Sequence, residues 1–201
     1  MREEFNESFK HLKKDPIMKS LINKFGDKIT LHGRSDKNLA KAISKLIIEQ
    51  QVSFKAAITI KKRFEILIAG MSCQDVILIE NEKLKSIGIS YRKVDYIKNV
   101  YSYFLNSNFD FYSQNTDSIM KELTKIKGIG KWTVEMFLIF ILFNKDIFSK
   151  GDLALINSIK INYDIKDLSE SNLDKIIEKW SPYKTIASLL LWESIENKIF
   201  A

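Results

Sequence analysis

The amino-acid sequence predicts an all-α fold, because apolar residues recur at helical spacing, helix caps recur along the chain and strand patterns are weak. Leu39, Ile43, Leu46 and Ile47 fall on one helical face, for example. The alternating segment at residues 28–32 is short and isolated, so we expect a connection there. With 45% hydrophobic and 11% aromatic residues among 201, the chain can bury a sizeable core. We expect about nine or ten short helices.

Capping residues predict where the successive helices begin and end. Ser35 is placed to cap the first helix, and Ser53 precedes a second helix that Gly70 closes in a left-handed conformation. Ser72 with Asp75 has the pattern of a capping box. Further helix starts are predicted after Ser90, at Thr116 or Asp117, after Ser169 and at Ser181-Pro182, where the proline would take the first helical position.

The longest apolar run, residues 136–143, predicts a buried central helix. Its eight residues are far short of the ~20 that span a bilayer. The first ten residues are charged, unlike a secretory signal. We therefore expect no membrane association and a cytoplasmic protein.

The charge balance favours a polyanionic partner. Lys and Arg number 32 and Asp and Glu 25, which gives a net charge of +7 and a pI of 9.3. Nucleic acid and an anionic membrane surface both carry the required charge, but the lysines are scattered rather than gathered on one helix face, which favours nucleic acid. The single cysteine, Cys73, excludes an intrachain disulfide and a cluster held by four thiolates. With only His11 and His32 besides, a zinc site is hard to build.

A glycine-containing turn between two predicted helices is the most informative segment. Gly128 and Gly130 let the backbone turn tightly and approach a ligand, and Ile129 between them would anchor the turn in the core. The amides that begin the next helix are unpaired donors that favour an anion. Lys127 and Lys131 add positive charge. We interpret the turn as a clamp for a phosphate backbone; the alternative is a helix corner that merely uses glycine.

A second turn of the same kind precedes the helix that starts at residue 91. Gly88 ends a short segment, Ser90 caps the helix, and Arg92 and Lys93 follow. This turn could contact a phosphate as well. The alternative is an ordinary capped turn with solvated charges.

These segments resemble the helix-hairpin-helix DNA glycosylase superfamily, and within it the 3-methyladenine DNA glycosylase II group. The resemblance covers about residues 36–192 in the expected order, which makes it more specific than any single motif. The matching stretches are residues 46–57, 87–94, 126–133 and 148–155, together with the closing segment 180–184 and Trp192.

The resemblance implies two helical lobes with a cleft between them. Residues 36–148 would form a central lobe that includes the hairpin at about 118–142. Residues 1–35 and 149–201 would fold together as the second lobe. The expected molecule is a monomer that binds double-stranded DNA containing damaged bases.

The resemblance makes Asp152 the candidate catalytic residue. Excision of a base passes through a transition state with oxocarbenium character, which a carboxylate below the sugar stabilises. The same group could orient or deprotonate the attacking water. An alkylated purine is already cationic, so one carboxylate can suffice where many glycoside hydrolases use two. The alternative is that Asp152 only caps the helix that starts at Leu153.

An aromatic pocket is expected to hold the extruded base. A duplex base must rotate out of the stack before it can be cleaved, and indoles attract a cationic ring. Trp132 and Trp192 are the candidates, with Met136 as a polarizable wall; Gln50 and Gln51 would fill the gap left in the stack. The alternatives are core tryptophans and a solvated helix end. Met136 stands where some relatives have an aromatic residue, which leaves the choice of damaged base open.

Two further features define the expected subclass. Relatives that also cut the sugar–phosphate backbone have a nucleophilic lysine at the position of Trp132, so the resemblance implies a monofunctional hydrolase. Backbone carbonyls of Thr124, Ile126 and Ile129 could bind a structural monovalent cation, and no cofactor or iron–sulfur cluster is expected. The expected DNA contacts are Gln50, Gln51, Gly88, Ser90, Arg92, Lys127, Gly128, Ile129, Gly130, Lys131 and Thr133.

The function expected from the sequence is therefore excision of alkylated purines in base excision repair, by a nucleoid-associated cytoplasmic enzyme. Two alternatives stay open. One is a glycosylase for mismatched or oxidised bases, and the other is a non-catalytic helix-hairpin-helix DNA-binding module.

Overall fold

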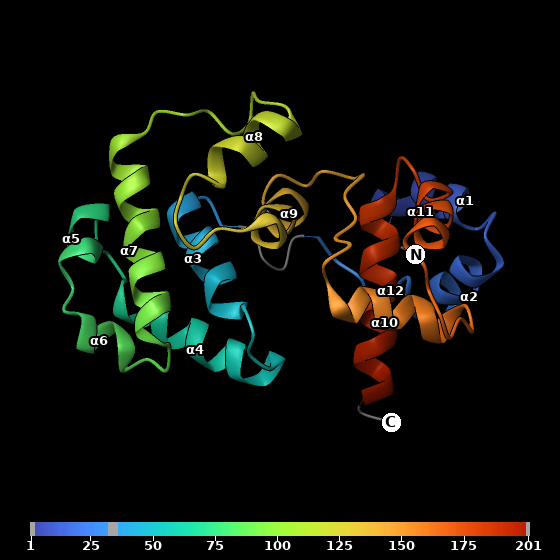
Figure 1. Cartoon of the computed structure of the whole chain (residues 1–201), viewed down its shortest axis with the longest axis horizontal. Coiled ribbons are helices and arrows are strands. Elements are labelled where there is room, and N and C mark those ends of the chain that lie inside the picture. The colour runs from blue at the N-terminus through green and yellow to red at the C-terminus, as the bar shows by residue number, and fades with distance from the viewer. Residues whose placement is uncertain (1–2, 32–35, 200–201) are drawn as a thin grey trace. The chain divides into compact units, whose positions relative to one another are not determined.

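The computed structural model describes residues 3–31 and 36–199, which form helices and loops (Figure 1). These ranges contain twelve α-helices, one short 3-10 helix and no strand, which confirms the all-α class and exceeds the expected number of helices. The elements are η1 (Glu3–Phe5), α1 (Asn6–Leu12), α2 (Pro16–Phe25), α3 (Leu39–Glu49), α4 (Phe54–Leu67), α5 (Cys73–Leu78), α6 (Asn81–Lys85), α7 (Tyr91–Asn106), α8 (Thr116–Leu123), α9 (Lys131–Phe140), α10 (Leu153–Asn162), α11 (Glu170–Glu178) and α12 (Lys184–Ile199).

The helices cluster into two compact units. The central unit comprises Arg34–Leu142 and contains α3 to α9. The terminal unit comprises Met1–Gly33 together with Phe143–Ala201, and contains α1, α2 and α10 to α12. In the described residues no helix is both long and apolar enough to cross a bilayer.

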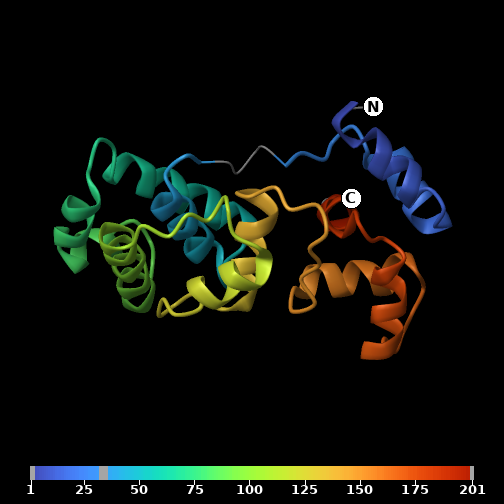
Figure 2. The same cartoon turned by 90° about the horizontal axis from the view of Figure 1, so that it is seen from above.

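The core of the central unit forms around α3, α7 and α9. Helix α7 packs against α3 and against α5 and α6, and α3 also contacts α4 and α9 (Figure 1). Figure 2 views α7 nearly end-on. Helix α9 is buried from Thr133 to Phe140, as the run of apolar residues on all its sides predicted. The Phe137 ring is fully buried, and its centroid lies 5.5 Å from that of Phe111.

In the terminal unit, α12 packs against α10 and α2, and crosses α10 in Figure 1. A buried polar cluster joins α10 to α12. The Ser158 hydroxyl donates to the Leu191 carbonyl at 2.8 Å, and its oxygen lies 2.8 Å from that of Ser194. Asn162 donates to the Ser194 hydroxyl at 2.9 Å. These bonds satisfy groups that would otherwise be costly to bury.

Most of the predicted helix signals are confirmed. Ser72 and Asp75 form the expected capping box, and Gly70 has a φ of +74° after α4. Helix α8 begins at Thr116, with Asn115 as its cap. Residues 28–31 form no strand, as expected, whereas His32 lies outside the described residues. The serines whose hydroxyls cap α4, α7 and α11 are Ser53, Ser90 and Ser169.

The prediction for Ser181-Pro182 is wrong, because α12 begins only at Lys184. The Ser181 hydroxyl donates to Asp146 at 2.8 Å instead of capping a helix. The Tyr183 amide donates to the Trp180 carbonyl at 2.7 Å, which closes a turn before α12.

Two other helix starts differ from the expectations. Ser35 lies outside the described residues, and the side chain that caps α3 is that of Asn38. Helices α1 and α2 form within residues 6–25, where the sequence patterns had predicted no helix. Asp15 before Pro16 was an available signal, since an aspartate cap followed by proline is a common helix start.

We expect the burial of Phe137 to be a major contribution to stability. Substitution Phe137→Ala should lower the free energy of unfolding by about 3–5 kcal/mol, because it leaves a cavity in a close-packed core. The matched control Ile66→Ala, at a side chain that is 68% exposed, should change it by less than about 0.5 kcal/mol. Urea denaturation followed by circular dichroism measures both, and equal effects would contradict the core assignment.

Candidate functional site

The turn between α8 and α9 depends on the absence of a side chain at Gly128. Its φ is +106°, a region that side-chain-bearing residues rarely adopt. A Cβ atom there would lie 2.2 Å from a ring atom of Tyr96 on α7. Ile129, the next residue, is buried as predicted and so anchors the turn. Gly130 differs, because a Cβ atom at that position would meet nothing within 4 Å.

The N-terminus of α9 has the features of an anion site. Its N-cap is Gly130, which supplies no side-chain hydrogen bond, whereas Ser90 and Asp152 cap α7 and α10. The first amides of α9 therefore receive no capping oxygen from the N-cap side chain, and the helix dipole favours negative charge beside them. Lys127 and Lys131 are exposed in this turn. Lys131 is 3.9 Å from Glu135, a long and weak ion pair.

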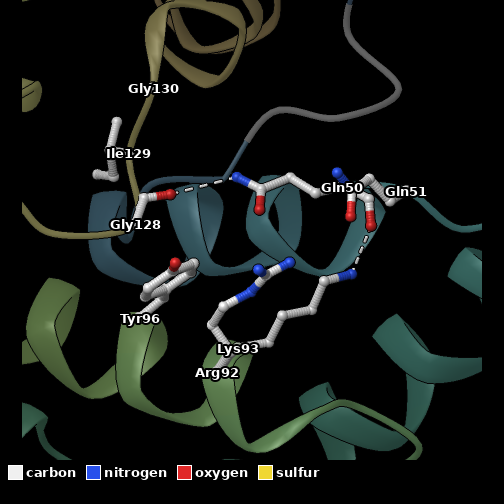
Figure 3. Close-up of a pocket in the computed structure, with 8 residues that line it drawn as sticks. All are labelled: Gln50, Gln51, Arg92, Lys93, Tyr96, Gly128, Ile129 and Gly130. Atoms are coloured by element: carbon white, nitrogen blue, oxygen red, sulfur yellow. Dashed lines mark hydrogen bonds between the residues drawn. The ribbon is translucent and has the colours of Figure 1, made fainter.

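A pocket of about 360 Å³ in the central unit brings several predicted residues together (Figure 3). It joins the C-terminal end of α3, the first turns of α7 and the hairpin. Its lining residues are Gln50, Gln51, Arg92, Lys93, Tyr96, Gly128, Ile129 and Gly130. The cationic side chains and the backbone of the turn thus face one opening, an arrangement suited to a phosphate.

Gln50 links α3 to the hairpin. Its side-chain amide donates to the Gly128 carbonyl at 3.3 Å (Figure 3), and to the Thr133 hydroxyl at 2.9 Å. It therefore connects the turn, at Gly128, with the first turn of α9, at Thr133. Gln51 is exposed and has a φ of +54°. Gln51 therefore lies in the short turn after α3, and its exposed side chain starts from that turn rather than from the helix.

Lys93 has a role in this pocket that the sequence analysis did not assign. Its ammonium group donates to the Ile48 carbonyl at 2.9 Å and to the Gln50 carbonyl at 2.6 Å, so it neutralises the C-terminal end of α3. Burial, and then the neighbouring charge of Arg92, lower the pKa of Lys93. Nothing in the local sequence distinguishes it from Arg92, because the carbonyls it contacts are more than 40 residues away in the chain.

The second predicted turn is a capped helix start. Gly88 has a φ of +107°, and the Ser90 hydroxyl accepts from the Lys93 amide at 3.4 Å. Neither Gly88 nor Ser90 lines the pocket, whereas Arg92 does. The contact of this turn with DNA remains a prediction.

In the terminal unit, the structure brings Asp152 and Trp192 together. Asp152 is the N-cap of α10, and its Oδ1 atom accepts from the Leu155 amide at 3.1 Å. The indole N–H of Trp192 on α12 donates to the same atom at 3.4 Å. The carboxylate is thus oriented by a backbone donor and a side-chain donor on two helices.

The other two residues of the expected base pocket belong to the central unit. Trp132 is half-buried on the first turn of α9. Met136, one turn further, is only 1% exposed. The structure therefore assigns Trp132 and Met136 to one unit, and Asp152 and Trp192 to the other.

The backbone carbonyls of Thr124, Ile126 and Ile129 are of a chemical type that can bind a cation. Thr124 is the C-cap of α8, where the helix dipole is negative. The Ile126 carbonyl accepts from the Ile129 amide at 3.0 Å, and a carbonyl oxygen has a second lone pair for a further partner. These oxygens are of the hard type that monovalent cations prefer.

Comparison with known proteins finds a family match over most of the chain. The model of the HhH-GPD superfamily base excision DNA repair protein matches residues 44–183. YfjP of Bacillus subtilis is 30% identical over 173 residues, which are 80% of this chain and 60% of that protein. DNA-3-methyladenine glycosylase 1 of Schizosaccharomyces pombe is 26% identical over 188 residues, 90% of this chain and 82% of that protein.

A solved structure has the same fold. It is the Schizosaccharomyces pombe 3-methyladenine DNA glycosylase in complex with abasic DNA. The TM-score is 0.87 at 24% identity, over 95% of this chain and 97% of that chain.

We expect Gly128 and Gly130 to respond differently to a methyl group. Gly128→Ala should lower the free energy of unfolding by more than about 2 kcal/mol, because the unfavourable φ costs about 1–2 kcal/mol before the contact with Tyr96 is counted. Gly130→Ala should cost less than about 1 kcal/mol, the scale of a changed N-cap. Thermal and urea denaturation of the two variants measure the difference. Equal stability would show that the turn does not require glycine at position 128.

Proposed function

The chain belongs to the HhH-GPD superfamily of base excision DNA repair proteins, and we propose that it is a monofunctional DNA glycosylase that removes alkylated purines of the 3-methyladenine type. The name of the Schizosaccharomyces pombe relative supports this substrate class. The proposed reaction is hydrolysis of the bond between the sugar and the damaged base, which leaves an abasic site. The proposed partner is double-stranded DNA, bound by a monomer that works in the cytoplasm on the nucleoid.

The observation that supports catalysis most directly is the carboxylate of Asp152. Its Oδ1 atom accepts from the Leu155 amide and the Trp192 indole, so the orientation of the carboxylate is fixed before substrate binds. A fixed negative charge stabilises the oxocarbenium-like sugar without reorganisation during the reaction. We propose that the same carboxylate orients the water that attacks the sugar carbon.

We propose that the indoles of Trp132 and Trp192 stack against the extruded base. A methylated purine carries a positive charge, which the face of an indole attracts. The Met136 thioether would add a polarizable contact. Because Gln50 is hydrogen-bonded to the hairpin, the exposed Gln51 is the better placed of the two glutamines to fill the gap in the base stack.

The hairpin is proposed to bind a phosphate of the DNA backbone without reading its sequence. The α9 amides, Lys127 and Lys131 would contact the phosphate, and Arg92 would contact a neighbouring one. We propose that the carbonyls of Thr124, Ile126 and Ile129 hold a monovalent cation. The cation would supply positive charge close to the same phosphate.

The substitution Asp152→Asn tests the catalytic role. It should reduce release of 3-methyladenine from methylated duplex DNA by at least about 100-fold, because it removes the negative charge that acts in the transition state. Asparagine is as good an N-cap as aspartate, so the thermal midpoint should change little. Release is measured by chromatography of the freed base, with DNA affinity measured in parallel.

The matched control is Asp15→Asn, which changes the aspartate that caps α2 in the same unit. This variant should retain excision. Oligonucleotides with single alkylated, oxidised or mismatched bases identify the substrate class. Release of only oxidised or mismatched bases would overturn the proposal, as would full activity of Asp152→Asn.

We also expect the product to be an intact abasic strand. The family resemblance implies that Trp132 stands where lyases have a nucleophilic lysine, and the adjacent Lys131 points about 100° away around the helix. After the damaged base is released, the enzyme should therefore leave the DNA strand uncut until alkali is added. Borohydride should trap no covalent protein–DNA adduct. A trapped adduct that persists in Lys131→Gln would mean that another amine of the chain acts as nucleophile.

A further inference from the structure

The terminal unit contains a second pocket at the end of α10 opposite to Asp152. Its volume is about 670 Å³, within the range of sites that bind compact ligands. Asp152 precedes α10 and Tyr163 follows it, and ten residues of helix separate them by about 15 Å. None of the residues assigned to catalysis or DNA binding above lines this pocket. The pocket is a candidate for a binding function that is separate from base excision.

The wall of the pocket is mainly apolar. Leu12, Pro16, Ile17 and the ring of Tyr163 contribute to it. Leu12 is fully buried at the end of α1, whereas Ile17 is half-buried on α2. An apolar side chain that entered here would remove the exposed parts of Pro16, Ile17 and Tyr163 from water, which is the main source of affinity at such sites.

The carboxylate in the pocket, Asp15, is already occupied on both oxygens. Oδ1 accepts from the Ile17 and Met18 amides at 2.8 and 3.2 Å, and so caps α2. Oδ2 accepts from the Tyr163 hydroxyl at 2.6 Å. Burial, and then this bond to Asp15, raise the pKa of Tyr163, so the hydroxyl remains a donor. Asp15 is thereby committed to the fold.

The rim of the pocket has two lysines available for a ligand. Lys14 and Lys179 are exposed, and the residues that the structure describes provide no ion-pair partner for either. The His11 ring donates from Nε2 to the Lys179 carbonyl at 3.0 Å, which fixes the backbone that presents this lysine. The acidic residue next to Lys179 in the chain, Glu178, pairs with Lys184 at 3.0 Å.

We propose that this pocket binds an acidic peptide segment of another protein, with one apolar side chain in the pocket and flanking carboxylates on Lys14 and Lys179. Complementary charge at the rim of an apolar pocket gives specificity for such a segment. A DNA backbone fits poorly, because it offers no apolar side chain for the wall that Pro16, Ile17 and Tyr163 form. The segment would attach the protein to a partner and leave Asp152 accessible.

The test uses the full chain and a fluorescein-labelled peptide of sequence Asp-Glu-Asp-Leu-Phe, followed by fluorescence anisotropy. The double variant K14E/K179E should weaken binding by at least about tenfold, because two attractive contacts become repulsive. The matched control K24E reverses an exposed charge on α2 that does not line the pocket, and it should change affinity by less than about twofold. The double variant should instead bind a Lys-Lys-Lys-Leu-Phe peptide better than the unsubstituted protein does.

Three outcomes would overturn the proposal. Equal binding of a peptide with Ser-Ser in place of Leu-Phe would mean that charge alone is responsible. Displacement of the peptide by undamaged duplex DNA would place it on the DNA surface. The third is an unchanged affinity in K14E/K179E. Excision by K14E/K179E should match that of the unsubstituted protein, so a failure here is distinguishable from a failure of the glycosylase assignment.

Discussion

The geometry of the hairpin depends on the contact between the backbone of Gly128 and the ring of Tyr96. A residue with a side chain would meet both an unfavourable φ and a collision with that ring. The close approach brings the turn against α7, and Gln50 then binds the turn from α3 through the Gly128 carbonyl and Thr133. Helices α7 and α3 thereby determine where α9 begins. The direction of the α9 amides follows from this arrangement.

A consequence of that arrangement is a difference between helix N-termini. Serine or aspartate side chains satisfy the first amides of α4, α7 and α10, whereas the glycine before α9 cannot. The α9 terminus lacks a side-chain cap, as those of α1 and α6 do, and it lies beside exposed lysines and Arg92. The first turn of α9 therefore lacks the stabilisation that a side-chain cap would give. A bound anion can supply the missing acceptor for its amides. A Cβ atom at Gly130 would meet nothing within 4 Å in the protein alone, so the space beside this residue is available to a ligand.

The sequence predicted those features that are determined within a few residues. Ser53, Ser72, Ser90 and Ser169 cap the helices they precede, because a hydroxyl reaches an amide three residues later whatever the rest of the chain does. Ser181 has the same local pattern and fails. Its hydroxyl binds Asp146 instead, a residue 35 positions away, and no local pattern reveals that competition.

The site was predictable to a similar extent. Gly128, Gly130 and Arg92 were found from local patterns and Gln50 from the family resemblance, and the structure places them around one pocket. Lys93 and Tyr96 were not given their roles, since these arise from contacts with Ile48, Gln50 and Gly128 that exist only after folding. Which tryptophan contacts Asp152 was equally invisible, because the Trp192 indole meets it from 40 residues away.

The two aspartate caps of the terminal unit explain how one residue type can be structural in one place and catalytic in another. Asp15 binds two amides through Oδ1 and a tyrosine hydroxyl through Oδ2, so the fold uses both of its oxygens. For Asp152, both the capping amide of Leu155 and the Trp192 indole bind Oδ1. The bond that caps α10 therefore also orients the Asp152 carboxylate, with the Trp192 indole as a second donor. One hydrogen bond thus has two effects: it caps the helix, and it holds the carboxylate in the orientation in which it can stabilise a cationic sugar. The site is therefore preorganised before substrate binds.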